Sequence, residues 1–141
     1  MIETTIADVV GHVHTHIRLP GKPDIAPVDA RVVLLKEREG ERLLPICVGR
    51  GDEGFLLVAQ LAGGTFSRPL TPDLAARLLE VSGAQIERVA IDAFRDHVFY
   101  ATVTVRAGES AQEVDARPSD ALNLAARLGS PIYVEPSVMD A

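Results

Sequence analysis

Strand-like and helix-like segments follow one another along this chain in an irregular order. The β-branched runs Val32–Leu35 and Leu43–Val48 precede an apolar run, Asp52–Leu61, that is typical of a helix buried on more than one side. Two further helical patterns and several strand patterns follow, without a regular alternation of strand and helix. The length of 141 residues suits one domain. We therefore expect a single compact α+β domain, residues 1–141, in which a mixed sheet of about six or seven strands packs with three helices.

Prolines and glycines mark the ends of the second and third helical patterns. Thr71 can cap the second helix with its hydroxyl, and Pro72 suits its first position. Gly83 suits the residue after its last turn, and Pro118 and Gly129 delimit the third helix in the same way. The apolar faces of these helices and of the neighbouring strands predict the core. Its expected members are Phe55, Leu56, Val58, Leu78, Leu79, Val89, Ile91, Val103, Leu124, Leu128 and Ile132.

Residues 1–31 form an N-terminal region of a different character. They contain a strand-like segment, Ile2–Ile17, and a loop with three prolines, Leu19–Val28. The strand-like segment has few features that would protect an exposed sheet edge, and pairing between subunits would cover it. This predicts a homo-oligomer, most simply a dimer.

Three histidines alternate within the same segment. On a strand, the side chains of His12, His14 and His16 would point to one face. Imidazoles in that arrangement can coordinate a transition metal, and a solvated strand face gives the same pattern. The sequence leaves the role of this face open.

Charge and hydropathy limit the classes of function. The chain has 14 Lys and Arg against 20 Asp and Glu, a formal net charge of −6. Proteins that hold nucleic acid by its phosphates usually present a basic face, so composition counts against a nucleic-acid partner unless a local positive cleft or bound metal ions hold the phosphate. Apolar stretches reach about six residues, far below the roughly twenty that span a bilayer, and the start resembles no signal peptide. We expect a cytoplasmic protein without membrane contact.

The densest polar cluster lies where a strand pattern ends and the third helical pattern begins. It contains Asp115, Arg117, Ser119 and Asp120, around Pro118. Backbone N–H groups at a helix start form an anion pocket, to which Arg117 and Ser119 add donors suited to phosphate. Asp115 and Asp120 can bind a divalent cation through oxygen. A simple helix cap, in which Arg117 pairs with one of the aspartates, explains the same residues.

This cluster belongs to one of three sequence blocks with a distinctive order and spacing. They are Leu44–Gly49 (LPICVG), Arg68–Leu74 (RPLTPDL), and Asp115–Ala121 (DARPSDA) followed by Arg127–Val134 (RLGSPIYV). In these blocks the chain resembles the bifunctional nuclease family, over residues 32–139. The resemblance implies a compact α+β domain that cuts both DNA and RNA.

The resemblance also implies a set of site residues. We expect a phosphodiesterase in which a divalent ion, Mg²⁺ or Mn²⁺, polarises the phosphate and supplies hydroxide, while arginines stabilise the developing charge. No organic cofactor is expected. The residues expected to act in catalysis are Asp115, Arg117, Ser119, Asp120, Arg68 and Asp73, and the expected metal ligands are Asp52, Asp115 and Asp120.

A second hypothesis makes the domain a non-catalytic interaction or regulatory module of the same fold. Pro72 stands where the family pattern has His, so proton transfer or metal binding by that His is not available. Arg68 and Arg117 could pair with Asp73 and Asp120 as buried braces between helices. The negative net charge of −6 also favours this hypothesis.

Overall fold

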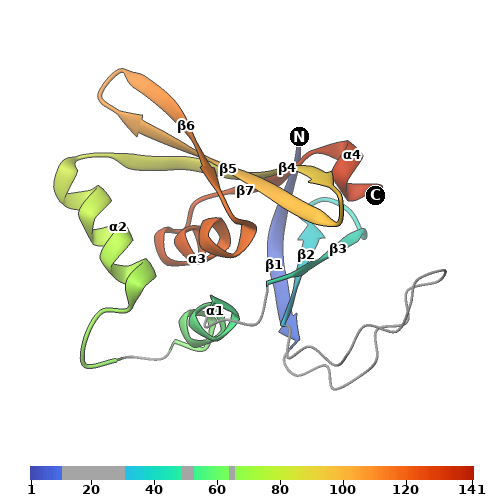
Figure 1. The fold of residues 1–141 in the computed structure, drawn as a ribbon, viewed down its shortest axis with the longest axis horizontal. Coiled ribbons are helices and arrows are strands. Elements are labelled where there is room, and N and C mark those ends of the chain that lie inside the picture. Colours follow the sequence, from blue (N-terminus) through green and yellow to red (C-terminus); the bar gives the residue numbers. More distant parts are fainter. Residues whose placement is uncertain (11–30, 49–52, 64–65) are drawn as a thin grey trace.

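The computed structural model describes residues 1–10, 31–48, 53–63 and 66–141 (Figure 1). In this part of the chain one mixed sheet of seven strands has the order β3-β2-β1-β7-β4-β5-β6. The strands are β1 (Ile2–Val10), β2 (Val32–Glu37), β3 (Leu43–Cys47), β4 (Gln85–Arg95), β5 (Val98–Ala107), β6 (Ser110–Ala116) and β7 (Ile132–Val134). The helices are α1 (Glu53–Leu61), α2 (Thr71–Ser82), α3 (Pro118–Leu128) and the short α4 (Pro136–Met139). The expected α+β class and mixed sheet are confirmed, with α4 as an addition.

The sheet consists of two antiparallel three-stranded units joined by β7. Strands β1, β2 and β3 form one unit, and β4, β5 and β6 form the other. Strand β7 pairs antiparallel with β1 and parallel with β4. Strand β1 is therefore interior, and β3 and β6 are the edges. The prediction that Ile2–Ile17 contains an exposed sheet edge is wrong for Ile2–Thr4, because these residues pair with β7. Residues 11–17 lie outside the described residues.

The helix ends follow the proline and glycine signals. Gly83 and Gly129 close α2 and α3 in the left-handed conformation, with φ of 81° and 67°, a conformation that favours glycine. Pro118 is the first residue of α3, as expected. At α2 the expected cap is wrong: Leu70 is the capping residue, and its N–H donates to the Asp73 carboxylate at 2.9 Å. No helix among the described residues is long and apolar enough to span a membrane.

Helices α1, α2 and α3 lie together on one side of strands β4 to β6 (Figure 1). Helix α3 packs against α1, α2, β4 and β5, so it is the centre of this layer. The largest fully buried hydrophobic side chains are Leu35, Ile46, Leu57, Ile91, Leu122, Val33, Val89, Val134 and Val138. Of the expected core residues, Val89, Ile91, Val103 and Ile132 are confirmed.

Other expected core residues are wrong in an instructive way. Leu78 and Leu128 are 61% and 42% exposed. On α3 the buried leucine is Leu122, with 0% exposure, beside Ala121 and Ala125 of the predicted apolar face. Four residues that were expected in the core are only half-buried: Leu56, Val58, Leu79 and Leu124. The side chain of Phe55 lies outside the described residues.

This placement of α3 gives a stability prediction. Leu122→Ala should lower the free energy of unfolding by about 2–5 kcal/mol, because it leaves a cavity in the core. Leu128→Ala, on the same helix, should change it by less than about 0.5 kcal/mol, because that side chain is partly in water. Urea denaturation of both variants measures the difference. Equal losses would show that the sheet-facing side of α3 is misassigned.

Candidate active site

The start of α3 presents an exposed arginine–aspartate pair. Strand β6 ends at Ala116 and Arg117 caps the helix. Arg117 donates from Nε to Asp120 Oδ2 at 2.8 Å and from Nη2 to Oδ1 at 3.1 Å, a two-pronged pair. The side chains are 65% and 50% exposed, so the pair is open to solvent. The Arg117–Asp120 pairing is as expected, but both residues belong to one helix start and are exposed, so this pair is not a buried brace between helices.

Ser119, between the members of this pair, is buried. Its exposure is 7%, and its carbonyl accepts a hydrogen bond from Asn123 Nδ2 at 2.9 Å. The first intrahelical bond at this end runs from Ala121 N–H to Arg117 O at 3.1 Å. The N–H groups of Ser119 and Asp120 come before it and have no partner within the helix, as at any helix start. Arg117 and Asp120 are therefore the accessible side chains of the predicted cluster at this helix start.

Asp115 lies in a separate row of polar side chains that crosses three strands. It is exposed on β6 and stands directly opposite Thr102 on β5, so the two side chains share a face of the sheet. The Thr102 hydroxyl donates to Asp92 Oδ2 on β4 at 2.5 Å. Within the described residues, Asp115 makes no ion pair with Arg117. Sequence reasoning missed Asp92, although a carboxylate directly after the apolar run Val89–Ile91 is a signal that could have found it.

Asp73, at the start of α2, pairs with an arginine that was not expected. Arg127 Nε donates to Asp73 Oδ1 at 2.6 Å, and the Arg127 side chain is only 5% exposed. The suggested pair of Arg68 with Asp73 is wrong. Arg68 is exposed and makes no hydrogen bond or ion pair with another described residue. Arg127 is the first residue of the sequence block RLGSPIYV, but no role was predicted for it.

Arg127 uses its whole guanidinium to hold the helices together. Besides Asp73, it donates from Nη1 to Asn123 Oδ1 at 2.9 Å and to Asn123 O at 3.2 Å. From Nη2 it donates to Leu56 O on α1 at 3.2 Å. One side chain on α3 therefore binds both α1 and α2. We call this set of contacts the Arg127 brace.

The Arg127 brace holds Asp73, so this predicted site residue is not part of the Arg117–Asp120 pair. Asp120 lies in the first turn of α3 and Arg127 in the last. At 1.5 Å per residue they are about 10 Å apart along the helix axis. Asp73 binds the Arg127 guanidinium, which also reaches Asn123 in the middle of α3, and it makes no hydrogen bond or ion pair with Arg117 or Asp120.

Carboxylates are available for a metal ion, but the described residues do not form a complete protein site. In the part of the chain that the structure describes, no three side chains of His, Cys, Asp or Glu come together as ligands. The expected ligand Asp52, and the histidines of residues 11–17, lie outside it. Mg²⁺ commonly binds through one or two carboxylates together with substrate phosphate. Asp115 and Asp120 fit that smaller requirement, each as a single exposed carboxylate.

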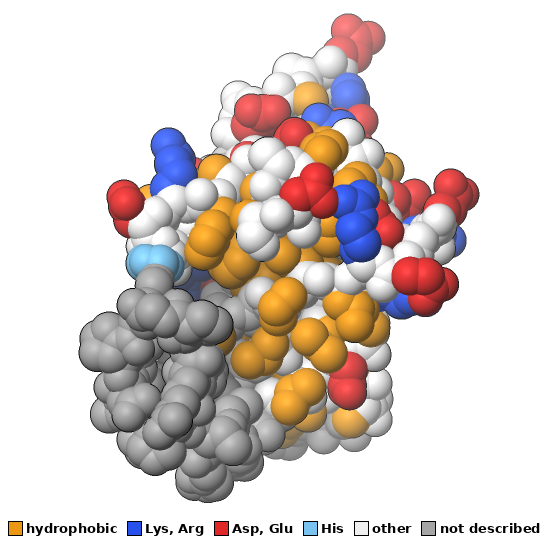
Figure 2. Space-filling model, turned by 90° about the vertical axis from the view of Figure 1, so that its right-hand side faces the viewer, with side chains coloured by type: hydrophobic (Ala, Val, Ile, Leu, Met, Phe, Trp, Pro, Cys, Tyr) orange, Lys and Arg blue, Asp and Glu red, His pale blue; other side chains and the backbone are white. Residues whose placement is uncertain are grey.

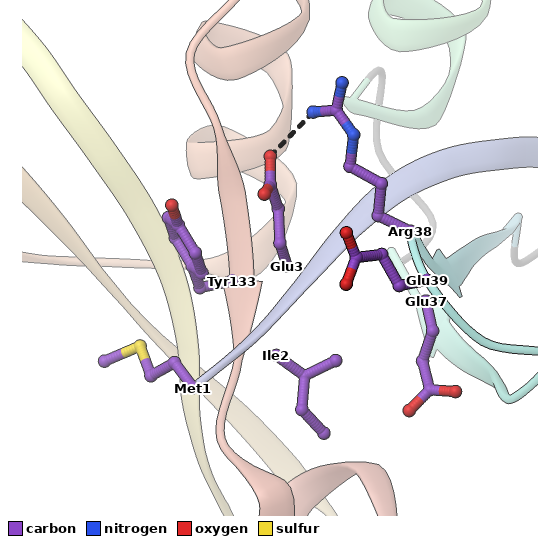
Figure 3. Close-up of a pocket in the computed structure, with 7 residues that line it drawn as sticks. All are labelled: Met1, Ile2, Glu3, Glu37, Arg38, Glu39 and Tyr133. Carbon is purple, nitrogen blue, oxygen red and sulfur yellow. Dashed lines mark hydrogen bonds and ion pairs between the residues drawn. The ribbon is translucent and has the colours of Figure 1, made fainter.

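A cavity of about 390 Å³ lies elsewhere, where the start of β1 meets β7 and the β2–β3 turn (Figure 3). Glu3, Glu37 and Glu39 line it together with Arg38. Arg38 Nη1 donates to Glu3 Oε1 at 2.7 Å, so that guanidinium already has a carboxylate partner. A wall dominated by carboxylates repels phosphodiesters, so this cavity is not the candidate nucleic-acid site.

Comparison with known proteins places the chain in a family. Residues 33–141 match the family model of the bifunctional nuclease domain. The chain belongs to that family. The match begins in β2 and includes the start of α3, the Arg127 brace and the polar row of β4 to β6. The family membership expected from the three sequence blocks is confirmed.

Two kinds of relatives accompany the bifunctional nuclease domain. An uncharacterized protein of Mycobacterium tuberculosis, present in two strains, is 35% identical over 123 residues, which cover 87% of this chain and 73% of the relative. A rice protein, Bifunctional nuclease 2 of Oryza sativa subsp. japonica, is 30% identical over 129 residues. These residues are 89% of this chain but 39% of the rice protein, so the domain is the smaller part of that relative.

The contacts of Asp73 predict how the stability of this bifunctional nuclease domain depends on pH. The Leu70 N–H, and then the guanidinium of Arg127, hold the pKa of Asp73 below its ordinary value, against the opposing effect of burial. A carboxyl with a lowered pKa in the folded state stabilises the fold above its unfolded pKa, and this contribution is lost as the pH falls through the folded pKa. Asp73→Asn should therefore be less stable than wild type above about pH 5, with a difference that shrinks below about pH 4.

Urea denaturation of both proteins across that pH range measures this difference. Asp140→Asn is the matched control, because Asp140 pairs with Arg42 at an exposed position. Its difference from wild type should stay small throughout. A difference between Asp73→Asn and wild type that does not change with pH would contradict the role assigned to the Asp73 carboxylate.

Proposed function

We propose that this domain is a nuclease that hydrolyses phosphodiester bonds of DNA and RNA at the start of α3. The observation that carries the proposal is the exposed Arg117–Asp120 pair in the family's signature block. Membership of the bifunctional nuclease domain family and the name of the rice relative support the same activity. A phosphodiester is an anion, and the start of a helix together with an arginine is suited to hold one.

Phosphate binding at this place begins with an exchange of partners. The Arg117 guanidinium bonds the Asp120 carboxylate through two nitrogens, in the planar arrangement that also fits two phosphate oxygens. Because the pair is exposed, its separation costs little, roughly 1 kcal/mol or less. A bound phosphodiester would take the place of the Asp120 carboxylate on Arg117. The positive end of the α3 dipole favours the same anion.

The exchange leaves the Asp120 carboxylate available for chemistry. In hydrolysis, the water oxygen attacks phosphorus, the bond to the leaving sugar oxygen breaks, and the water loses a proton to a base. Asp120, whose carboxylate pairs with Arg117, takes the role of that base. Arg117 stabilises the negative charge that gathers on the phosphate oxygens in the transition state. Ser119, which is buried, contributes its backbone N–H rather than its hydroxyl.

The exposed carboxylates of Asp120 and Asp115 would hold a divalent ion in this proposal, with Asp52 as a further proposed ligand. When bound, Mg²⁺ or Mn²⁺ lowers the pKa of a coordinated water and neutralises phosphate charge. It would also offset the net charge of −6, which otherwise repels nucleic acid. Arg68, on the segment before α2, is the proposed second contact for the nucleic-acid backbone. Asp73 is not part of this proposal, because the Arg127 brace already uses its carboxylate.

The second candidate function is a non-catalytic interaction or regulatory module. Two observations favour it: the Asp73 carboxylate is used by the Arg127 brace, and Pro72 occupies the position of the family's His. On this reading, the Arg117–Asp120 pair caps α3 and binds no substrate. The two functions give opposite results when these two residues are replaced.

Digestion of labelled single-stranded DNA and RNA by purified full-length protein, with Mg²⁺ or Mn²⁺ and with chelator, tests the nuclease. Arg117→Ala should lower kcat/KM by about 100-fold or more, as the loss of one transition-state donor does. Asp120→Asn should lower kcat by a similar factor, because the amide cannot accept the proton at the pH of the assay. Chelator should abolish cutting if the ion takes part.

Arg106→Ala and Glu87→Gln are matched controls. These two residues form another exposed arginine–carboxylate pair, at 3.3 Å, on β5 and β4. Both control variants should cut like wild type. Equal cutting by wild type, Arg117→Ala and Asp120→Asn would assign the activity to a contaminant and leave the interaction module. The expected cytoplasmic location stays a prediction, which fractionation of cells that express the tagged protein can check.

A further inference from the structure

Helix α2 carries apolar side chains on two opposite faces. Ala75, Ala76 and Leu79 are half-buried and belong to the face that meets α3. Leu74, Leu78 and Val81 are 52%, 61% and 70% exposed. At 100° per residue, these three form a stripe that lies roughly 140° around the helix from the inner face. We call Leu74, Leu78 and Val81 the outer stripe.

The outer stripe has no covering element among the described residues. None of the residues of α2 is buried. Helices that are apolar on more than one face normally lie between two partners in a folded protein. The stripe has the spacing of four and then three residues that helices use to pack against each other. Helix α2 also lies at the outer side of the helical layer, beyond α3 (Figure 1).

The residues on the two sides of the outer stripe indicate what kind of helix packs against it. On one side lie Arg77 and Glu80, whose charged groups are 3.2 Å apart and 67% and 68% exposed. On the other side lie two small hydroxyl residues, Thr71 and Ser82, which allow close approach. A two-fold axis places the flank with Arg77 and Glu80 beside the same flank of a second copy. The positive group of each copy then lies near the negative group of the other, so the two flanks attract each other.

We propose that α2 packs antiparallel against α2 of a second copy of this chain, about a two-fold axis near Leu78. In that arrangement Leu74 packs against the partner's Val81, and Leu78 lies beside the partner's Leu78. Arg77 then lies beside the partner's Glu80, and Glu80 beside the partner's Arg77. The interface is independent of the nuclease proposal, because the outer stripe and its flanks include none of the residues proposed for catalysis.

The Arg127 brace prepares α2 for this contact. Arg127 binds Asp73 in the first turn of α2, so the helix is fixed to α3 before any partner arrives. A preformed surface binds with less loss of conformational freedom than a mobile one. The sequence predicts a dimer that pairs through the N-terminal strand segment, whereas the outer stripe places the proposed interface on α2.

A second exposed apolar region provides the control. Seen from the side of α4 and the C-terminus, hydrophobic side chains gather near the centre of the molecule (Figure 2). On the edge strand β3, Leu43 is 51% exposed, which is close to Leu78. Next to it, Pro45 has no N–H and interrupts the edge against pairing with another strand. Leu43→Asp is therefore a matched substitution on a surface that we do not assign to the dimer.

Analytical ultracentrifugation and light scattering of the full chain test the proposal. Wild type should have twice the chain mass of 15.1 kDa at micromolar concentration. Leu78→Asp should raise the dimer dissociation constant by about 100-fold or more, because a charge is buried without a partner. Leu43→Asp should leave the dissociation constant within about threefold of wild type. A monomeric wild type, or equal effects of Leu78→Asp and Leu43→Asp, would overturn the proposal.

A charge exchange tests the two-fold arrangement itself. Arg77→Glu places only negative groups along the flank and should weaken the dimer by about tenfold. Combining it with Glu80→Arg restores opposite charges and should return the dissociation constant to within about threefold of wild type. Far-UV circular dichroism checks that α2 stays helical in each variant. A double variant as weak as Arg77→Glu, with its helix intact, would exclude self-pairing through α2.

Discussion

The guanidinium of Arg127 is the group on which the arrangement of the helical layer depends. A buried cation is tolerated only where its donors are satisfied, and Arg127 finds acceptors on all three helices of the layer: Asp73 on α2, Asn123 on its own helix and the Leu56 carbonyl on α1. Hydrophobic contact alone would let α1 and α2 slide over α3. The directional bonds of one side chain fix their positions, and with them the surfaces that each helix leaves exposed.

Local signals in the sequence predict the local parts of this structure. Pro118 and Gly129 give the ends of α3 because a missing N–H and a left-handed residue act within one turn. The Arg117–Asp120 pair was also foreseen, since its members are three residues apart. The choice between Leu122 and Leu124 as the buried leucine was not predictable in this way. Both fit a helix with an apolar face, and only the position of the sheet decides between them.

The candidate site shows the same division between local and distant contacts. Asp73 and Arg127 are 54 residues apart, and a sequence with several exposed arginines gives no reason to choose Arg127 as the partner. Thr102 and Asp92 come together only because β4 and β5 pair in a particular register. Family resemblance identified the blocks, but it grouped Asp73 with the Arg117–Asp120 pair, whereas the fold uses the Asp73 carboxylate to bind Arg127. Chemistry assigned from motif order therefore needs the geometry of the helices before roles can be given.

The three residues of β7 have a consequence for how the chain is made. Ile132–Val134 is the strand that joins the two halves of the sheet, and Thr4 donates its hydroxyl hydrogen bond to the Ile132 carbonyl across 128 positions of sequence. During synthesis from the N-terminus, β1, β2 and β3 are made long before β7, so the edge of β1 that pairs with β7 is covered late. Until then β1 and β4 each expose a strand edge at the place where β7 will lie. A chain that lacked Ile132–Val134 would therefore contain two half-sheets without their connecting strand, and its two uncovered strand edges would favour aggregation.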